Sequence, residues 1–496
     1  MSTDLSKLLH WLKIDSKNLD IEVSGLCLDS RKITQGDVFI ALSGFDNHGI
    51  DFAYQVQRGG AVAIIAESLS KGKAKPKGRQ QPIDIPVIEV EDLTKKLGML
   101  ASNFYGNPSD KLEIIGITGT NGKTSCAWLL LQSWAELSVK GAYIGTLGFG
   151  TLQQINSLPN TTPTALELQK ILADFVSQGI THVSVEVSSH GLSLGRVNST
   201  KIKGAGLTNI SRDHLDFHET MEQYSEAKKL LFTNFDLEFS IINANDYYGK
   251  QWENEIKSKV ISYGIDADDS DIVAKNLVLT PSGIDFDLHW NKQAHHLHSK
   301  LLGKFNVDNL MLIIAALIEQ GFGIGEIVKI IPKLNPVPGR MNCVATNKDQ
   351  PLIIVDYAHT PDALKQVLIA LKEHNARKIW CIFGCGGNRD KGKRPQMGHI
   401  AETHADFVIV TDDNPRYENN QQIVQDILMG MNTKPMVLHD RKQAIAYAIN
   451  HAHNSDLILI AGKGHEPYQL INGQYHDFDD RVISAQLLSD KKEKCA

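Results

Sequence analysis

The stretch TGTNGKTS, at residues 118–125, has the residue types and spacing of a phosphate-binding loop. Gly119 and Gly122 let the backbone wrap closely around an anion, because glycine adopts conformations that other residues avoid. The N–H groups of such a loop, and the N-terminus of a following helix, attract negative charge. Lys123 is expected to reach the β- and γ-phosphates of a nucleotide, and the hydroxyl of Thr124 to ligate Mg²⁺.

The neighbouring sequence supports a nucleotide site rather than a merely flexible turn. An apolar run at 112–117 predicts a strand before the loop, and CAWLLLQSWAEL predicts a helix after it. The usual pattern has a further glycine five residues before Gly122, where this chain has Ile117. The central Gly-Lys-Thr and its strand–turn–helix context are nevertheless present.

Polar side chains follow two other predicted strands of the same region. Glu186 ends the run HVSVE, and His214 follows the run AGLTNI within SRDHLD. Ligands of open α/β sheets gather at the carboxyl ends of the strands, so both residues are candidate metal ligands near the phosphates. Chemistry alone leaves Asp213 and Asp216 equally plausible, and a lone histidine is more often structural.

A third candidate is Arg416, in the stretch TDDNPRYE at 411–418. The apolar run FVIV precedes it, and Asp413, Asn414 and Pro415 form a strong turn signal. Arg416 therefore lies just past a predicted strand end. A guanidinium at that place suits a carboxylate or a phosphate, and a solvated loop charge is the alternative.

Two further glycine-rich stretches and a group of histidines are less specific. The stretch at 384–394, GCGGNRDKGKR, lacks the full dinucleotide-binding spacing, so a plain loop with basic residues is the default interpretation. AGKGHE at 461–466 is by itself a strand ending in a flexible turn. The histidines at 289, 295, 296 and 298 lie in an alternating polar stretch without evident carboxylates, which favours a solvated strand and turn over a metal site.

The elements that must position these residues fall into three segments. Short strands at 38–42, 61–66 and 85–90 mark the first, and strands alternating with helices follow the phosphate loop in the second. The proline-rich stretch at 332–340 leads into a third segment, where the alternation resumes. The sequence predicts an α/β protein with an N-terminal domain at 1–110, a central phosphate-loop domain at 111–335 and a C-terminal Rossmann-like domain at 336–496.

Bulk composition limits the class of protein. With 496 residues the chain is long enough for about three domains. A net charge of -6 and a pI near 6.3 argue against a nucleic-acid binder held by bulk charge. No apolar run is long enough for a membrane span, the N-terminus does not look like a signal peptide, and the cysteines are scattered. We therefore expect a cytoplasmic protein, acting as a monomer, without nucleic-acid or membrane partners.

Several motifs together resemble the Mur ligases of bacterial cell-wall synthesis. They are GTNGKT in the phosphate loop, TTPT at 161–164, EVSSHGL at 186–192, SRDHLD at 211–216 and DYAHTPDAL at 356–364. The resemblance spans essentially the whole chain and includes the three-domain layout. Within the family, DSR at 29–31, SRDHLDFH and DNPR indicate the member that adds the third residue of the peptide, diaminopimelate, to UDP-MurNAc-L-Ala-D-Glu.

The resemblance implies that ATP phosphorylates the D-Glu side chain and that the amine of an amino acid then attacks the acyl phosphate. The expected co-substrate is ATP, and the expected cofactor is Mg²⁺, with two ions bound. The implied catalytic residues are Lys123, His214 and Lys228, and Lys228 matches a lysine that the family carbamylates. The implied metal ligands are Thr124, Glu186, His214 and the carbamate of Lys228. An ordinary lysine on a helix surface is the alternative for Lys228, which has Lys229 beside it.

The remaining positions carried over bind substrates. The implied ATP contacts are Gly119, Thr120, Asn121, Gly122, Lys123, Thr124, Ser125, Asn306, Arg340 and Asp356. The implied UDP-sugar contacts are Leu28, Ser30, Phe45, Asp46, Asn47, Asn160, Thr161, Thr162, Ser188 and Arg196. Close relatives carry a glutamine two residues before that arginine, where this chain has Leu194. The implied diaminopimelate contacts are Arg389, Asp413, Asn414, Pro415, Arg416, Gly462 and Glu466.

Arg416 distinguishes between the possible amino-acid substrates. Diaminopimelate differs from lysine by one extra carboxylate, which a guanidinium can hold through two parallel hydrogen bonds. Family members that add lysine typically lack arginine at this position of the motif, so the sequence favours diaminopimelate. The alternatives are a lysine-adding ligase or a folylpolyglutamate synthase and, from another class, a regulatory ATP-binding switch without ligase chemistry.

Overall fold

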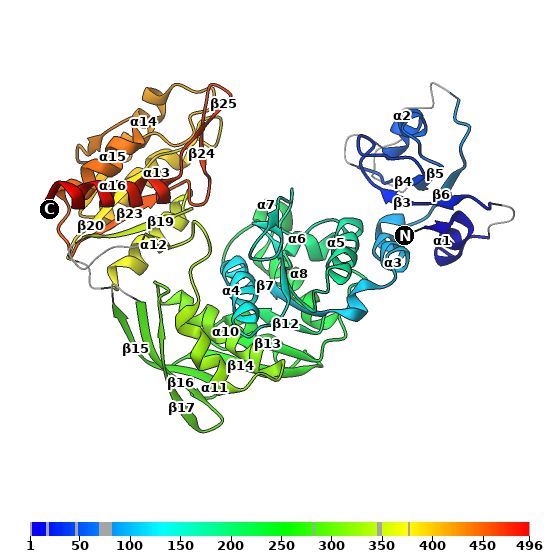
Figure 1. The fold of residues 1–496 in the computed structure, drawn as a ribbon, viewed down its shortest axis with the longest axis horizontal. Helices are drawn as coiled ribbons and strands as arrows, with labels where there is room; N and C mark the ends of the chain where they lie inside the picture. The colour runs from blue at the N-terminus through cyan, green and yellow to red at the C-terminus, as the bar shows by residue number, and fades with distance from the viewer. Residues whose placement is uncertain are drawn as a thin grey trace. The chain divides into compact units, whose positions relative to one another are not determined.

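The computed structural model describes residues 2–15, 19–44, 48–68, 82–280, 283–344, 350–374 and 377–495 (Figure 1). For residues 216 and 492–495 it describes the backbone alone. Contacts divide the chain into two compact units, Met1–Ser262 and Tyr263–Ala496, and each unit is described by itself.

The first unit begins with a small parallel sheet of order β3-β4-β5-β6, covered on both faces. Helices α1 and α3 share one apolar core with the sheet, and α2 packs in a second core around Phe39 and Ile64. The three strands expected in this segment are therefore confirmed. The elements are β1 (Thr3–Asp4), α1 (Leu5–Trp11), β2 (Glu22–Val23), β3 (Gly25–Cys27), β4 (Asp37–Ala41), η1 (Gly49–Phe52), α2 (Ala53–Arg58), β5 (Ala63–Glu67), β6 (Val87–Val90), α3 (Leu93–Phe104) and η2 (Pro108–Lys111).

The second part of this unit is a larger sheet with β7 among its central strands. Its first seven strands, of the eleven in the sheet, have the order β10-β9-β8-β11-β7-β12-β13, and β8, β11, β7, β12 and β13 run parallel. The elements are β7 (Glu113–Thr118), α4 (Lys123–Glu136), β8 (Gly141–Gly145), β9 (Gly148–Gly150), β10 (Ile155–Asn156), α5 (Ala165–Ser177), β11 (His182–Glu186), α6 (Ser189–Ser193), β12 (Gly204–Leu207), α7 (Leu215–His218), α8 (Met221–Thr233), β13 (Phe239–Asn243) and α9 (Tyr247–Trp252).

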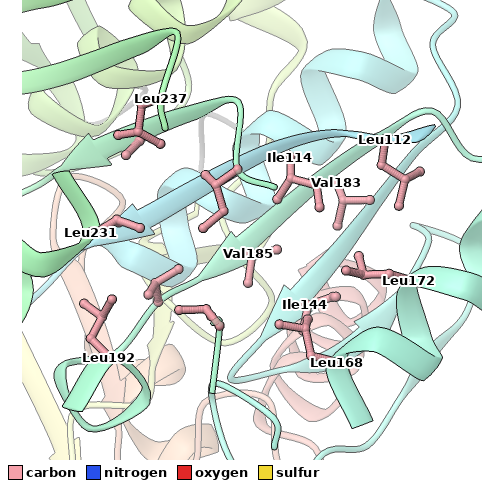
Figure 2. Packing of buried hydrophobic residues seen from close by; sticks show 14 of the residues in the cluster. Leu112, Ile114, Ile144, Leu168, Leu172, Val183, Val185, Leu192, Leu231 and Leu237 are labelled. Carbon is pink, nitrogen blue, oxygen red and sulfur yellow. The ribbon is translucent and has the colours of Figure 1, made fainter. Parts of the chain in front are cut away.

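The core of this sheet explains why its strands read as nearly continuous apolar runs. Ile114, Val183 and Val185 are buried against α5 residues such as Leu168 and Leu172 (Figure 2). Parallel strands covered on both faces need apolar side chains on both sides, not an alternating pattern. The register sets Glu186 beside Ile117 and Leu207 beside Thr118, so the strand ends that carry candidate ligands meet at one edge.

The second unit contains three antiparallel strands, β15 to β17, and two α-helices before its Rossmann-like part. The elements are β14 (Lys259–Ile265), which runs across the boundary between the units, β15 (Ile272–Thr280), β16 (Gly283–Trp290), β17 (Gln293–Ser299), α10 (Phe305–Glu319), α11 (Ile324–Ile330) and η3 (Ile331–Lys333). The four histidines lie on β16 and β17, as expected for a strand and turn.

The expectation that these histidines lack carboxylate neighbours is wrong. Cross-strand pairing puts His296 beside Asp287 and His298 beside Asp285, each with Nδ1 3.0 Å from a carboxylate oxygen. Among the described residues there is still no group of three or more His, Cys, Asp or Glu side chains that could hold a metal ion. The strand interpretation therefore holds, with surface hydrogen bonds between histidines and carboxylates added to it.

The Rossmann-like part is a sheet of order β18-β19-β23-β20-β21-β22, parallel except for β18. Helices α12, α13 and α14 contribute to the core on one face, and α15 and α16 to that on the other. The elements are β18 (Asn342–Val344), β19 (Leu352–Asp356), α12 (Pro361–Lys372), β20 (Ile379–Phe383), α13 (Lys393–His404), β21 (Phe407–Val410), α14 (Asn420–Leu428), β22 (Met436–Val437), α15 (Arg441–His451), β23 (Leu457–Ala461), β24 (Tyr468–Ile471), β25 (Gln474–Asp477) and α16 (Asp480–Cys495). Because β23, β20 and β21 are adjacent and parallel, the loops at 384–390, 411–418 and 462–466 leave the same edge of the sheet.

Candidate active site

The phosphate loop joins β7 to α4 as the sequence predicts. Gly119 has a φ of 142° and Gly122 a φ of 87°, both in the region that favours glycine. A Cβ at Gly119 would lie 1.9 Å from the Thr208 hydroxyl, so no other residue fits there. The Lys123 ammonium donates hydrogen bonds of 2.8 Å to the carbonyl oxygens of Gly119 and Thr120. The lysine thus lies folded over its own loop, where the phosphates of a nucleotide would bind.

The Glu186 carboxylate is fully buried at the end of β11 and faces the start of α4. It accepts hydrogen bonds from the Thr124 hydroxyl at 2.9 Å, from the Thr146 N–H at 2.9 Å and from the Thr146 hydroxyl at 3.2 Å. The Tyr143 hydroxyl also donates to it. Sequence reasoning missed Tyr143, which lies in the middle of β8, and Thr146, which directly follows that strand.

Thr124 and Glu186 fit a magnesium ion by the chemistry of their donor atoms. Both offer oxygen, the ligand that Mg²⁺ prefers, and Mg²⁺ usually takes only one or two protein ligands and completes its shell with water and phosphate oxygens. The hydroxyl and the carboxylate already lie within hydrogen-bonding distance of each other, so one ion could contact both.

Lys228 lies on α8 with only 1 % of its surface exposed, which contradicts the alternative of a surface lysine. Its ammonium donates a hydrogen bond of 2.8 Å to the carbonyl oxygen of Gly119 and lies 4.6 Å from the centre of the Tyr224 ring. Burial, reinforced by the charge of Lys123, holds the pKa of Lys228 well below its usual value. The neighbouring Lys229 instead pairs with Glu226 and Glu255.

His214 precedes the short helix α7 in a left-handed conformation, with a φ of 52°. Its Nε2 is 3.4 Å from a carboxylate oxygen of Asp213, so His214 contacts one of its two alternatives, while the side chain of the other, Asp216, lies outside the described part of the chain. The His214 ring lies 4.9 Å from the His190 ring and 6.2 Å from that of Tyr224. Since Tyr224 also contacts Lys228, the structure brings His214 into the same region as the buried lysine.

Part of the expected UDP-sugar set forms one cluster beside Glu186. The Thr162 hydroxyl donates to the Glu186 carbonyl oxygen at 2.9 Å and lies 3.0 Å from the Ser188 hydroxyl. Arg196 donates to the Thr162 carbonyl oxygen at 2.8 Å. The Thr161 hydroxyl is 3.1 Å from that of Thr146.

The other members of that set make no described hydrogen bond to this cluster or lie outside the description. Asn160 is exposed, and Leu28 and Ser30 are half-buried after β3, with no described hydrogen bond to the cluster. Phe45, Asp46 and Asn47 lie outside the described residues. Leu194, where close relatives carry glutamine, ends α6 with 46 % of its surface exposed.

Asp356 and Asn306, two of the nucleotide contacts expected from the second unit, are held by hydrogen bonds. The Asp356 carboxylate is buried and accepts hydrogen bonds of 2.7 Å from the N–H groups of Met341 and Ala358. Burial raises its pKa. Through the hydrogen bond from Met341, the Asp356 carboxylate anchors the segment that carries Arg340. The Asn306 side chain donates to the Leu302 carbonyl oxygen at 2.7 Å and accepts from Asn309 at 2.8 Å.

Several residues of the expected amino-acid pocket lie on the loops that follow β21 and β23, next to β24. Asn414 donates to the Glu466 carboxylate and accepts from the Leu470 N–H, both at 2.8 Å. Burial, followed by the charge of Asp413, raises the pKa of Glu466. A Cβ at Gly462 would lie 2.5 Å from Asp413 Oδ2, so this glycine leaves room for the carboxylate. Pro415 is buried within the same turn.

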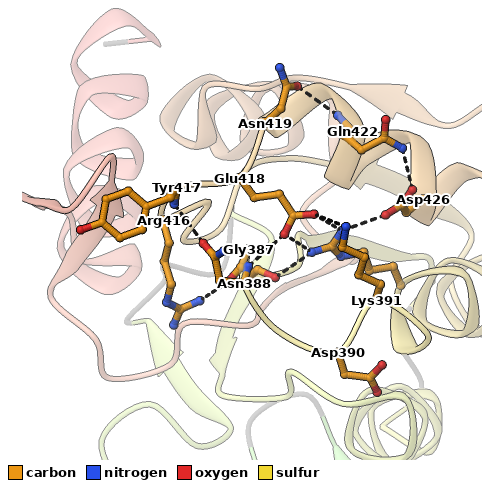
Figure 3. A network of polar contacts seen from close by, with 12 residues as sticks. Gly387, Asn388, Asp390, Lys391, Arg416, Tyr417, Glu418, Asn419, Gln422 and Asp426 are labelled. Atoms are coloured by element: carbon orange, nitrogen blue, oxygen red, sulfur yellow. Dashed lines mark hydrogen bonds and ion pairs between the residues drawn. The ribbon is translucent and has the colours of Figure 1, made fainter.

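Arg416 is half-buried and directed toward the loop after β20. One guanidinium nitrogen donates to the carbonyl oxygen of Gly387 at 2.9 Å (Figure 3). Its backbone has a φ of 55° and donates to the Leu470 carbonyl oxygen at 2.9 Å. Arg389, in that same loop, is exposed and makes no hydrogen bond among the described residues. Both arginines of the expected diaminopimelate set therefore belong to adjoining loops.

Sequence reasoning missed two buried cations near this pocket. Lys463 is fully buried, 3.8 Å from the Glu466 carboxylate, and it donates to the Tyr468 carbonyl oxygen. Arg394 is fully buried as well, so the interpretation of 384–394 as a plain loop is wrong at this residue. The partners of Arg394 come from separate elements, which periodicity along the chain does not reveal, whereas those of Lys463 lie three and five residues farther along the chain.

Comparisons with known proteins agree over nearly the whole chain. The pattern of the Mur ligase family, catalytic domain, matches residues 22–105, that of the Mur ligase middle domain 117–317, and that of the Mur ligase, glutamate ligase domain, 339–464. The UDP-N-acetylmuramoyl-L-alanyl-D-glutamate–2,6-diaminopimelate ligase of Xylella fastidiosa is 43% identical over 477 residues, covering 95% of this chain and 94% of the relative. The enzyme of the same name from Haemophilus influenzae is 41% identical, covering 98% of this chain and 100% of the relative.

Solved structures extend the similarity to the fold. One of a UDP-N-acetylmuramoyl-L-alanyl-D-glutamate–2,6-diaminopimelate ligase superposes with a TM-score of 0.75 at 36% identity, covering 99% of this chain and 100% of that one. A Mycobacterium tuberculosis folylpolyglutamate synthase, at 16% identity, has a TM-score of 0.59 and covers 75% of this chain and 92% of its own, which shows a shared fold alone. No helix among the described residues is long and apolar enough to cross a membrane.

Proposed function

This chain belongs to the Mur ligase family, and from that premise we propose that it joins meso-2,6-diaminopimelate to UDP-N-acetylmuramoyl-L-alanyl-D-glutamate at the expense of ATP. Relatives named for this reaction match about the whole chain at 41% to 43% identity. The choice of diaminopimelate rests on the position of Arg416. This residue lies at the carboxyl edge of the Rossmann-like sheet, beside Asn414 and Glu466.

The reaction must turn an unreactive carboxylate into one that an amine can attack. The γ-phosphoryl group of ATP passes to the side-chain carboxylate of D-Glu, giving an acyl phosphate and ADP. The amine of diaminopimelate attacks the acyl carbon, and phosphate leaves as the amide forms. The protein's task is to neutralise charge and to align three substrates.

The phosphate loop and its surroundings are proposed to carry the first step. The N–H groups of residues 119–125 bind the phosphates, and Lys123 leaves its two carbonyl partners to contact the transferred group. Thr124 and Glu186 would hold Mg²⁺, which when bound offsets the negative charge on the phosphates. Thr146 and Tyr143 orient the Glu186 carboxylate toward that position.

Lys228 is proposed to carry a carbamate that binds a second Mg²⁺ together with His214. The buried amine has a pKa well below its usual value, and only a neutral amine can attack carbon dioxide to form a carbamate. The change would turn a buried cation beside Lys123 into an anion next to the phosphates. An unmodified lysine at this place has no evident partner of opposite charge within hydrogen-bonding distance among the described side chains.

The acceptor pocket is proposed to select diaminopimelate through its distal carboxylate. Arg416 would exchange its bond to the Gly387 carbonyl oxygen for two parallel bonds to that carboxylate. Glu466 and Asp413 supply negative charge for an ammonium group. L-Lysine would leave the guanidinium without an anionic partner, and sites of this kind discriminate against such an analogue by ~10⁴-fold, about 5.5 kcal/mol.

An ADP-release assay with a panel of amino acids tests the proposal. With UDP-MurNAc-L-Ala-D-Glu present, meso-diaminopimelate is expected to support turnover, whereas L-lysine and L-glutamate are not. Equal turnover with L-lysine would contradict the role of Arg416. Slow ATP hydrolysis that does not depend on the UDP-sugar or on any amino acid would instead indicate an ATP-binding switch. Addition of glutamate to a folate would indicate a folylpolyglutamate synthase.

A further inference from the structure

A buried ion pair lies directly behind the two loops that carry Arg416 and Arg389. Arg394, near the start of α13, donates to both carboxylate oxygens of Glu418 at 2.8 Å, and to Asp426 of α14 at 2.8 Å (Figure 3). The Arg394 side chain is fully buried and that of Glu418 is 12 % exposed. Hydrogen bonding from Arg394 holds the pKa of the Glu418 carboxyl at about 2, so the pair is ionised near neutral pH.

Glu418 also contacts the loop after β20. The same Oε2 that accepts from Arg394 accepts from the Asn388 N–H at 2.9 Å. Asn388 returns the contact, because its side-chain oxygen accepts from the Tyr417 N–H at 3.1 Å. The two loops are therefore joined through Glu418, which follows Tyr417, and Asn388, which precedes Arg389.

A second set of contacts joins the loops close to the Arg416 guanidinium. The Gly387 N–H donates to the Asn414 carbonyl oxygen at 2.9 Å, and the Gly387 carbonyl oxygen accepts from Arg416 at 2.9 Å. A Cβ on Gly387 would lie 2.0 Å from the Pro415 carbonyl oxygen, so the approach requires glycine here. The acceptor that sets the direction of Arg416 is thus fixed by a loop that Glu418 holds.

We propose that Arg394 and Glu418 are positioning residues for the amino-acid pocket, which set the place of Arg416 and Arg389 and thereby the affinity for the distal carboxylate of the acceptor. The proposal rests on the function proposed above, in which Arg416 binds that carboxylate. A carboxylate clamp depends on direction as well as charge, because both parallel hydrogen bonds must be made at once. Neither Arg394 nor Glu418 needs to touch the substrate.

Three variants test the proposal through the Michaelis constants of the separate substrates. Arg394→Met keeps the bulk of the buried side chain and removes its charge, and Glu418→Gln keeps shape but loses one acceptor. Each is expected to raise KM for meso-diaminopimelate between about tenfold and about hundredfold, since small displacements of a binding group have effects of this size. KM for ATP and for the UDP-sugar should stay within about twofold of the wild type, because their expected sites lie on other loops.

Asn388→Gly keeps the test informative if the buried variants fold poorly. Asn388 is exposed and has a φ of 52°, which glycine adopts readily, so this change removes only the bond to the Tyr417 N–H. It should raise KM for diaminopimelate in the same direction with an unchanged thermal midpoint. The double variant Arg394→Met/Glu418→Gln should be no worse than the more impaired single variant, because both changes break one unit.

The matched control is the ion pair at the opposite ends of the same two strands. Lys378 precedes β20, Asp406 precedes β21, and their charged groups are 2.7 Å apart. Lys378→Met should leave all three Michaelis constants unchanged. If wild-type turnover depends on diaminopimelate and the three test variants keep the wild-type KM for it, the positioning role is wrong. If the wild type does not respond to diaminopimelate at all, the proposed function fails instead.

Discussion

The side-chain nitrogen of Lys228 donates a hydrogen bond of 2.8 Å to the carbonyl oxygen of Gly119, the first glycine of the phosphate loop. The bond joins α8 to the turn between β7 and α4, two segments more than a hundred residues apart in the chain. It places a group that family resemblance marks for carbamylation against the backbone that would bind phosphate.

Lys228→Ala should therefore lose most ligase activity, and short carboxylates such as acetate should restore part of it by occupying the place of the carbamate. We expect a loss of about a hundredfold or more, as for removal of a group that stabilises transition-state charge. The measurement is ADP release with and without added carboxylate. Lys229→Ala is the matched control, since that neighbour pairs with Glu226 and Glu255 and should tolerate the change. Near-normal turnover of unrescued Lys228→Ala would remove it from the catalytic residues.

Gly462→Ala should impair the amino-acid pocket through steric contact. The glycine has a φ of 116°, and a Cβ there would lie 2.5 Å from Asp413 Oδ2. We expect the KM for diaminopimelate to rise by about tenfold or more, because backbone strain and a displaced carboxylate act together. Gly321→Ala is the control: its φ of 90° is also positive, but a Cβ would meet nothing within 4 Å. An unaltered KM in Gly462→Ala would show that the pocket adapts.

Arg441→Met should destabilise the Rossmann-like part, because it leaves the Asp480 carboxylate buried without its partner. The two side chains are fully buried and joined by two hydrogen bonds of 2.8 and 2.9 Å. Breaking such a pair costs about 3–5 kcal/mol, whereas replacing both partners by apolar groups is often neutral. Urea denaturation should show the loss in Arg441→Met and recovery in Arg441→Met/Asp480→Leu. Equal loss in both variants would mean that packing and not charge dominates.

His374 should make stability depend on pH in a defined direction. Its Nε2 accepts from the Gly303 N–H at 2.7 Å and its Nδ1 lies 2.6 Å from the Thr280 carbonyl oxygen, an arrangement that only the neutral ring satisfies. Burial lowers its pKa from the usual 6.5. The unfolded chain therefore binds the proton more readily, so the stabilisation is present above about pH 6.5 and is lost as the pH falls.

Thermal midpoints across pH test this expectation. Between about pH 7.5 and pH 5.5 the wild-type midpoint should fall more steeply than that of His374→Asn, which cannot take up the proton. His476→Asn, on the exposed strand β25, should keep the wild-type slope. Parallel slopes for the wild type and His374→Asn would contradict the assignment of a neutral ring.

The sequence predicts the parts of the site that depend on local spacing. The phosphate loop follows from two glycines, a lysine and a threonine in a strand–turn–helix context, and the structure confirms that context. Glu186 is found because it closes an apolar run, and Arg416 because a strong turn signal separates it from the end of the run FVIV. These features need only the neighbouring residues along the chain, together with the rule that ligands gather at the carboxyl edge of a parallel sheet.

Contacts between distant segments are what the sequence leaves open. Lys228 and Lys229 are adjacent on one helix, and only packing against the phosphate loop shows which of them is buried. Arg394 and Glu418 lie on different elements, so neither a periodic pattern nor a motif joins them. The carboxylates opposite His296 and His298 depend on the register of a hairpin. Each of these contacts depends on the three-dimensional packing of segments that are separate along the chain, and motifs and periodic patterns do not predict it.

The adjacency of β20 and β21 has a consequence for how this protein could change its substrate. The residues that would recognise the acceptor lie on short connections at one edge of a sheet, whereas the phosphate loop belongs to the other compact unit. We therefore expect that the loops at 386–390 and 413–418 can be replaced together by those of another ligase, provided that Arg394 is retained or replaced with them. Transplanting both connections at once from a lysine-adding ligase should redirect the choice of amino acid while the handling of ATP is inherited unaltered.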